Sequence, residues 1–205
     1  MKDCIVYNGK LFQVLNRTKE ATLTVAGNTI SKRVQYELVR RPPGVRAIVV
    51  KKDKLLLTYE YRYELNEWDY RLPGGKVCDT TDEYVWSLTQ GTIDEDVTKK
   101  LKQELLEEAG VNVLQYRPLN ILHCGMTVEW DLYYFLVDDF TILPHTSVQK
   151  SEYEFIENRW VDFSEALTLC LEGKVSEARS AFEIIRFILK TQQGVDDHAY
   201  LPISQ

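Results

Sequence analysis

The sequence lacks the features that mark several large classes of protein. Its four cysteines lie far apart and form no C-x-x-C pair, so neither a disulfide framework nor a zinc site is predicted. The three histidines match no metal-binding spacing. No apolar run approaches the roughly 18 residues that span a bilayer, and the N-terminal residues contain no secretory h-region. These absences favour a cytoplasmic protein with reduced thiols and no membrane partner.

The sequence also lacks an excess of basic residues. It carries 25 Lys and Arg against 31 Asp and Glu, a formal net charge of −6, which makes a nucleic-acid partner a poor match. The 205 residues are 44% hydrophobic and 27% charged, an ordinary composition for a globular chain. This length allows one substantial domain with a small appendage.

Turn residues and prolines predict the domain organisation. Residues 1–40 contain alternating apolar positions around a Gly27-Asn28 turn, which indicates a small antiparallel β subdomain. Pro42 and Pro43 follow and end strand pairing. We therefore place the main domain at 41–191, and a polar tail at 192–205.

The most informative stretch is Glu95–Val111, EDVTKKLKQELLEEAGV, which predicts one amphipathic helix. Apolar residues recur every four positions along it, and Gly110 is placed to end it. Three carboxylates gather near its C-terminal end, where they repel each other and oppose the helix dipole. They are either a solvated acidic face or ligands for a hard cation, Mg²⁺ or Mn²⁺: Glu104, Glu107 and Glu108.

The surroundings of this helix resemble a known motif. QELLEEAGV resembles the second half of the Nudix box, G-x5-E-x7-R-E-U-x-E-E-x-G-U, and Leu72–Val77, LPGGKV, resembles the loop that opens it. Two departures stand out: Gln103 replaces the arginine of the box, and residues 78–92 are an insertion. The insertion could form a short helix or a lid, and we expect it to shape substrate selection.

The chain is on this basis similar to Nudix hydrolases of the ADP-ribose pyrophosphatase-like subgroup, and the similarity covers most of its length. It implies an α/β fold, the Nudix α/β/α sandwich with a mixed sheet, preceded by the small N-terminal antiparallel β subdomain. It also implies a homodimer, because the N-terminal subdomain crosses to a partner in such enzymes. In the metal site, the carbonyl of Gly74 would join Glu104 and Glu108, with Glu107 sharing an ion or standing behind it.

The resemblance further assigns roles outside the box. Arg40, Arg41 and Arg62 lie where the subgroup places arginines that contact substrate phosphates; the alternative for each is an ordinary surface residue. Two later segments offer acidic residues near the metal, Gly125–Glu129 and Ser151–Ile156. The resemblance makes Glu152 the general base with Glu129 as the competing candidate, and Glu154 an extra metal ligand; by spacing alone Glu152 and Glu154 are an exposed acidic loop.

The activity implied is Mg²⁺- or Mn²⁺-dependent attack of water on a diphosphate. The leading substrate is a nucleoside diphosphate sugar, with ADP-ribose, cleaved to AMP and ribose 5-phosphate, ahead of UDP-glucose and GDP-mannose. The sequence does not choose among them. The alternative from another class is a non-catalytic Nudix-fold module that senses a nucleotide sugar, which Gln103 and the insertion motivate.

Overall fold

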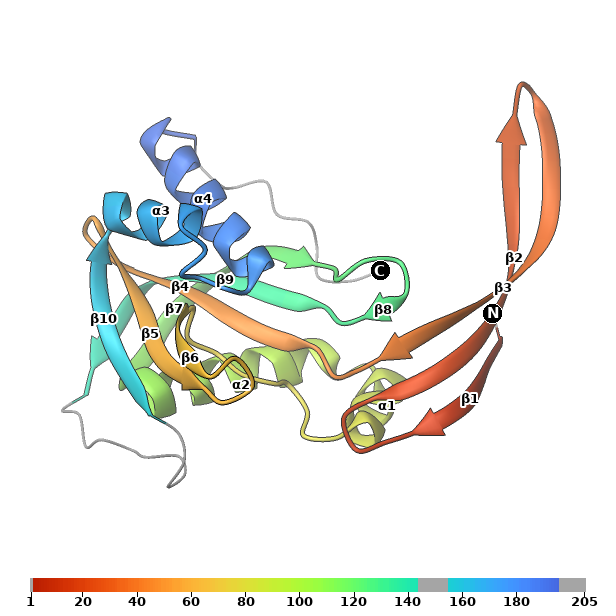
Figure 1. Ribbon diagram of the computed structural model, residues 1–205, viewed down its shortest axis with the longest axis horizontal. Helices are drawn as coiled ribbons and strands as arrows, with labels where there is room; N and C mark the ends of the chain where they lie inside the picture. The colour runs from red at the N-terminus through yellow and green to blue at the C-terminus, as the bar shows by residue number, and fades with distance from the viewer. Residues whose placement is uncertain (1, 144–154, 196–205) are drawn as a thin grey trace.

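A mixed six-stranded sheet forms the centre of the computed structural model, which describes residues 2–143 and 155–195. Its strand order is β10-β5-β4-β9-β7, and β6 pairs with β5. The β4–β9 pair is parallel and the other pairs are antiparallel, as Figure 1 shows. The strands are β4 (Gly44–Lys51), β5 (Lys54–Arg62), β6 (Glu67–Arg71), β7 (Val111–Leu122), β9 (Leu132–Ile142) and β10 (Ile156–Asp162).

Helices cover both faces of this sheet. Side chains alternate between faces along a strand, so Val45, Ala47 and Val49 of β4 pack against α2 (Ile93–Ala109) in one core. Ile48 belongs to the second core, with α3 (Phe163–Leu171) and α4 (Ala178–Gln192). The two cores on opposite faces confirm the α/β/α sandwich that the sequence predicts.

Helix α2 is the helix expected around the acidic cluster. It begins two residues before Glu95 and ends at Ala109, with Gly110 in the left-handed conformation as its C-cap. The apolar stripe is buried, as expected: Val97, Leu101, Leu105 and Ala109 are at most 5% exposed. Glu104 and Glu108 flank this stripe on the helix surface, and Glu104 is buried with it.

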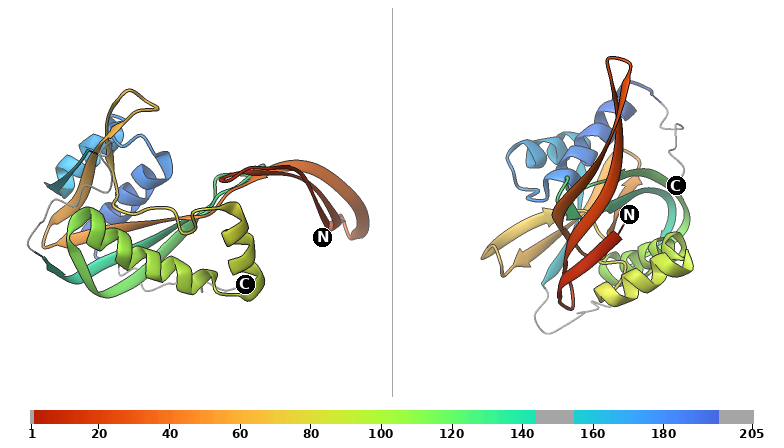
Figure 2. Two further views of the ribbon diagram at one scale, coloured as in Figure 1. Left: turned by 90° about the horizontal axis from the view of Figure 1, so that it is seen from below. Right: turned by 90° about the vertical axis from the view of Figure 1, so that its right-hand side faces the viewer.

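The N-terminal strands form a second sheet beside the body. Strands β1 (Lys2–Asn8), β2 (Gln13–Val25) and β3 (Asn28–Arg40) pair antiparallel, and β8 (Val128–Glu129) joins β3 in parallel. The β2–β3 hairpin continues past β1 as an arm that projects from the molecule (Figures 1 and 2). Its residues from Ala21 to Gln35 are nearly all exposed. This sheet agrees with the expected antiparallel unit, and β8 adds a strand from the main domain.

The insertion at 78–92 folds as helix α1 (Thr81–Gln90). Thr80 and Glu83 form a capping box at its start. The backbone N–H of Thr81 donates to the carbonyl of Lys10 at 2.9 Å, in the β1–β2 turn. Helix α1 therefore lies against the N-terminal sheet and beside α2. None of the helices described in 2–143 and 155–195 is long and apolar enough to cross a membrane.

Candidate active site

The glycine-rich loop after β6 lies against the first residues of β4. The N–H of Val45 donates to the carbonyl of Gly75 at 2.9 Å, and the N–H of Ala47 donates to that of Pro73 at 3.0 Å. Gly74 has φ +143°, and a Cβ there would overlap the carbonyl of Val45. Only glycine allows this backbone approach, so the loop is held flat against the strand.

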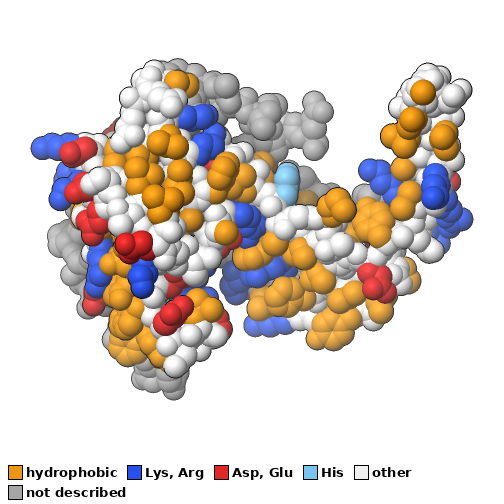
Figure 3. All heavy atoms as spheres, turned by 45° about the horizontal axis from the view of Figure 1, so that its top comes forward, with side chains coloured by type: hydrophobic (Ala, Val, Ile, Leu, Met, Phe, Trp, Pro, Cys, Tyr) orange, Lys and Arg blue, Asp and Glu red, His pale blue; other side chains and the backbone are white. Residues whose placement is uncertain are grey.

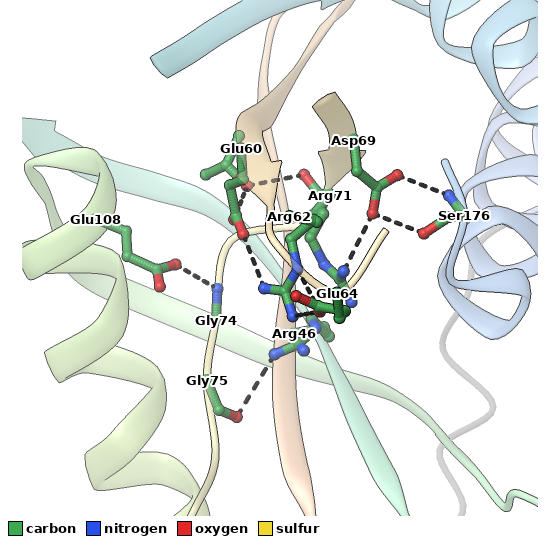
Figure 4. Close-up of polar contacts among 11 residues, drawn as sticks. Arg46, Glu60, Arg62, Glu64, Asp69, Arg71, Gly74, Gly75, Glu108 and Ser176 are labelled. Atoms are coloured by element: carbon green, nitrogen blue, oxygen red, sulfur yellow. Dashed lines mark hydrogen bonds and ion pairs between the residues drawn. The ribbon is translucent and has the colours of Figure 1, made fainter. Parts of the chain in front are cut away.

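Two of the α2 carboxylates face this loop. The N–H of Gly74 donates to Oε2 of Glu108 at 2.9 Å (Figure 4). One turn earlier, the Glu104 side chain lies against Gly75, because a Cβ on that glycine would come within 2.5 Å of its carboxylate. Glu104 is 4% exposed, and Lys100 Nζ is 3.0 Å from its Oε1. Positions four apart share a helix face, so the two carboxylates enter the site together.

Glu107 has a different position. It accepts a hydrogen bond of 2.8 Å from Nε2 of Gln103, the residue that replaces the box arginine. It does not line the cleft that Glu104 and Glu108 face. The register of the helix explains this, since Glu107 is turned about 100° from Glu108 around the helix axis.

A cleft of about 430 Å³ opens in front of the glycine loop and the two carboxylates. Phe155 and Ile156 line it near β10, and Trp130 and Leu132 line it near the start of β9. Five cationic side chains reach this cleft, against three carboxylates, Glu60, Glu104 and Glu108. The cations are Arg41, Arg46, Arg62, Arg71 and Lys76.

Two of the three arginines expected to contact substrate line the cleft. The Arg41 guanidinium stacks on Trp130 at 4.1 Å and lies 5.2 Å from the ring centre of Phe12. Burial lowers the pKa of Arg41, and the neighbouring Arg46 and Arg179 charges lower it further. Arg62 is paired with Glu60 at 3.5 Å and with Glu64.

Arg40 and Glu129 form part of a separate ion-pair network. Glu129 accepts from Arg17 and, at 2.8 Å, from Nε of Arg40, while Asp3 pairs with both arginines at 2.8 and 3.0 Å. The network joins β1, β2, β3 and β8. Arg40 and Glu129 line another hollow, beside Tyr84 of α1, and not the cleft. Their placement favours a structural role in the N-terminal sheet.

Four charged residues of the cleft were not predicted from the sequence, and one of them, Lys76, lies in the glycine-rich loop itself. Of the other three, Arg46 lies in β4, Glu60 in β5 and Arg71 at the end of β6. Asp69 pairs with Arg71 at 3.1 Å and accepts from the N–H and Oγ of Ser176 at 2.9 and 2.7 Å. One signal was available for Arg46, because a charged residue interrupts the apolar run GVRAIVV of a central strand.

The oxygen atoms near the glycine-rich loop bear on the metal site that the sequence predicts. No group of three or more His, Cys, Asp or Glu side chains in 2–143 and 155–195 is arranged to hold an ion. Glu104 and Glu108 remain, together with any backbone carbonyl of the loop. Mg²⁺ is commonly bound through one or two carboxylates, with water and substrate phosphates completing the shell, so this oxygen donor set fits it. Glu152 and Glu154 lie outside the described residues.

Comparisons with known proteins agree with this architecture. No protein-family model matches the chain. A curated CMP-5'-(N-acetyl-N-hydroxy-3-aminopropyl)phosphonate hydrolase from Streptomyces rubellomurinus (strain ATCC 31215) is 26% identical over 188 residues, which cover 86% of this chain and 80% of that protein. A solved structure of an ADP compounds hydrolase matches with a TM-score of 0.58 at 18% identity, over 96% of this chain and 98% of that one. The structural likeness confirms the Nudix α/β fold, and both proteins are named hydrolases.

Proposed function

We propose that this chain is a hydrolase of the diphosphate linkage in a nucleoside diphosphate sugar, with ADP-ribose as the leading substrate. The observation that carries the proposal is the contact of the glycine loop with Glu108, beside Glu104, at a cleft lined by five cations. A diphosphate is multiply anionic, and arginine guanidinium groups bind phosphate oxygens through paired N–H donors. The two hydrolase relatives support the reaction class, and UDP-glucose and GDP-mannose remain the alternative substrates.

The reaction needs a water molecule to attack one phosphorus while the bond from the bridging oxygen to that phosphorus breaks. For ADP-ribose the products are AMP and ribose 5-phosphate. Mg²⁺ or Mn²⁺, when held by Glu104, Glu108 and the Gly74 carbonyl, would neutralise phosphate charge and raise the acidity of a bound water. Arg41 and Arg62 would orient the phosphates, and Glu152 keeps the role of general base in this proposal.

The relative from Streptomyces adds one specific candidate. Its name gives a CMP-5'-phosphonate as its substrate. Such a molecule also joins a nucleotide phosphate to a second anionic phosphorus centre, so the same cleft could accept it. We therefore add CMP-phosphonates to the substrates that a test must include.

A Mg²⁺-dependent hydrolysis screen tests the proposal. The panel contains ADP-ribose, UDP-glucose, GDP-mannose and a CMP-phosphonate, with product formation followed by anion-exchange chromatography. We expect release of a nucleoside monophosphate from one member, and loss of that release with EDTA. Tight binding of a panel member without turnover would instead favour a non-catalytic sensor of a nucleotide sugar.

We also propose a homodimer that uses the projecting arm. Its exposed apolar side chains include Leu23, Val25, Ile30 and Val34, each at least 36% exposed, and Figure 3 shows hydrophobic side chains along the arm. A partner that covers exposed apolar residues on a two-stranded arm removes them from water, and this burial stabilises the dimer. Light scattering of the full chain, and of a Leu23→Lys/Ile30→Lys variant, tests this proposal; we expect a dimer and a monomer respectively.

A further inference from the structure

Two of the five cations of the cleft, Arg41 and Arg46, form no ion pair with a carboxylate in the described residues, but Arg41 stacks on Trp130. Arg62 pairs with Glu60 and Glu64, Arg71 with Asp69, and Lys76 with Asp79. Arg46 has no carboxylate within 4.0 Å in the described part of the chain, although it lies on a central strand. Arg46 is only partly exposed, and a partly buried guanidinium without a counter-ion loses hydration that a bound anion would replace.

The hydrogen bonds of Arg46 leave one edge of its guanidinium open. Nη1 donates to the carbonyl of Val45 at 2.8 Å and lies 3.5 Å from that of Gly75. Within 2–143 and 155–195, Nε and Nη2 make no hydrogen bond. These two atoms carry parallel N–H groups, the fork that matches two oxygens of one phosphoryl group. The contacts of Nη1 fix the guanidinium at the wall of the cleft, with Nε and Nη2 available to a ligand.

The surroundings of Arg46 also favour an anionic ligand. Figure 4 shows Arg46, Arg62 and Arg71 converging from β4, β5 and β6. Burial lowers the pKa of Arg46 and the nearby Arg71 charge lowers it further, while the carboxylates of Glu108 and Glu60 oppose this shift. Asp69 holds Arg71 in place and is itself held by Ser176. The positive charges of Arg71 and Arg46 therefore stay close together and repel each other. An anion between the arginines would relieve this repulsion.

We propose that Arg46 is a specificity-determining residue whose Nε–Nη2 edge binds one anionic phosphorus centre of a two-phosphorus linkage. The cleft would thereby prefer a diphosphate, or a phosphate–phosphonate, over a nucleoside monophosphate. This inference rests on the proposed function for the identity of the site, but it concerns recognition and not turnover. It predicts that the two-phosphorus preference depends on one side chain.

Binding of ligands that cannot be hydrolysed at the linkage tests the inference. Affinities of α,β-methylene ADP and CDP, and of AMP and CMP, are measured by calorimetry in Mg²⁺ for the full chain and for Arg46→Met and Arg46→Lys. We expect the protein to prefer the methylene analogue of at least one nucleoside, and Arg46→Met to lose about 10- to 100-fold of that preference. Arg46→Lys keeps the charge without the fork and should recover only part of it.

Two controls separate recognition from folding and from catalysis. Arg117→Met removes an arginine that pairs with Asp138 at 2.6 Å, away from the cleft, and should keep the preference. Thermal unfolding of each variant reports loss of structure. Such a loss would weaken the binding of monophosphates and of diphosphates to the same extent.

Two binding results overturn the inference: a protein without preference for two-phosphorus ligands, or an Arg46→Met variant that retains the preference. Dependence on Arg46 without hydrolysis of any panel substrate would instead leave recognition standing and refute only the proposed enzymatic function.

Discussion

The backbone N–H of Gly74 donates a hydrogen bond of 2.9 Å to Oε2 of Glu108, and this contact joins the glycine loop to the acidic helix. It brings together two segments that are 34 residues apart in the chain. The insertion between them, folded as α1, leaves this contact intact. The loop and the helix therefore form one site although the motif that links them is interrupted.

Alanine substitutions at the two loop glycines should have different effects: one should mainly lower turnover, and the other should mainly lower the free energy of unfolding. In Gly75→Ala the three atoms nearest to the new Cβ all belong to the Glu104 carboxylate, at 2.5–3.0 Å, the end of a flexible side chain. We expect turnover to fall at least tenfold while the free energy of unfolding changes by about 1 kcal/mol. In Gly74→Ala the Cβ meets the Val45 backbone at φ +143°, so a loss of about 3 kcal/mol is expected. Urea unfolding and turnover of both variants check this, and equal stability losses would contradict it.

Removal of the carboxylate charge at Glu104 or Glu108 should abolish most of the activity. If both bind the metal, Glu104→Gln and Glu108→Gln should each lower turnover by about 100-fold or more. Loss of repulsion between neighbouring carboxylates should leave thermal stability intact. Steady-state kinetics at saturating Mg²⁺ measure this effect.

Two further variants serve as controls for the kinetics of Glu104→Gln and Glu108→Gln. Glu107→Gln should be less damaging than Glu108→Gln, because Glu107 does not line the cleft. Glu172→Gln, an exposed residue at the end of α3, should match the unmodified protein. Near-normal turnover of Glu104→Gln or Glu108→Gln would exclude that residue as a ligand.

The ion-pair network at Asp3 should make the free energy of unfolding fall as the pH becomes acidic. Hydrogen bonding from Arg17 holds the pKa of the Asp3 carboxyl below its usual 3.8. A depressed folded-state pKa stabilises the protein above the unfolded pKa, and this contribution disappears as pH falls through the folded value. We expect Asp3→Asn to cost about 1–2 kcal/mol at pH 7, and this gap to shrink as pH falls from the unfolded-state pKa through the folded-state pKa of Asp3. Unfolding curves across that range test it; a pH-independent gap would argue against the ion pair.

Helix α1 should act on stability and not on substrate choice. No residue of 78–92 lines the cleft, whereas Thr81 contacts Lys10 and Ser87 donates to Asp96 at 2.5 Å. Loss of the capping box in Thr80→Ala should cost about 1 kcal/mol and leave the ranking of substrates unchanged. A changed ranking in the hydrolysis screen would support the sequence-based expectation that the insertion selects substrate.

The four cysteines should differ in reactivity. Burial raises the pKa of Cys78 and of Cys170 to about 11, and the thiolate is the reactive form. Cys4 and Cys124 are exposed. Brief treatment with iodoacetamide at pH 8, followed by peptide mass spectrometry, should label the two exposed residues first. Comparable labelling of Cys78 in the folded protein would show that its environment is more open than the structure indicates.

Local patterns in the sequence determined most of the fold. The four-residue apolar period of α2, the turn at Gly27 between β2 and β3, and the prolines after Arg40 are properties of short segments. Each predicted an element or its end. The pairing of Glu104 with Glu108 could also be predicted, because residues four apart on a helix always share a face. The Gly74–Gly75 loop could be recognised because glycine is required where backbones approach closely.

Tertiary structure alone decided which charged residues share the cleft. Arg46, Glu60 and Arg71 come from three strands, and their convergence depends on strand register and on the direction in which each strand ends. Arg40 and Arg41 are neighbours in sequence but point to opposite sides of their strand segment. One therefore enters the ion-pair network with Glu129 and the other the cleft. Such long-range pairing is set by packing between distant segments, which no local pattern records.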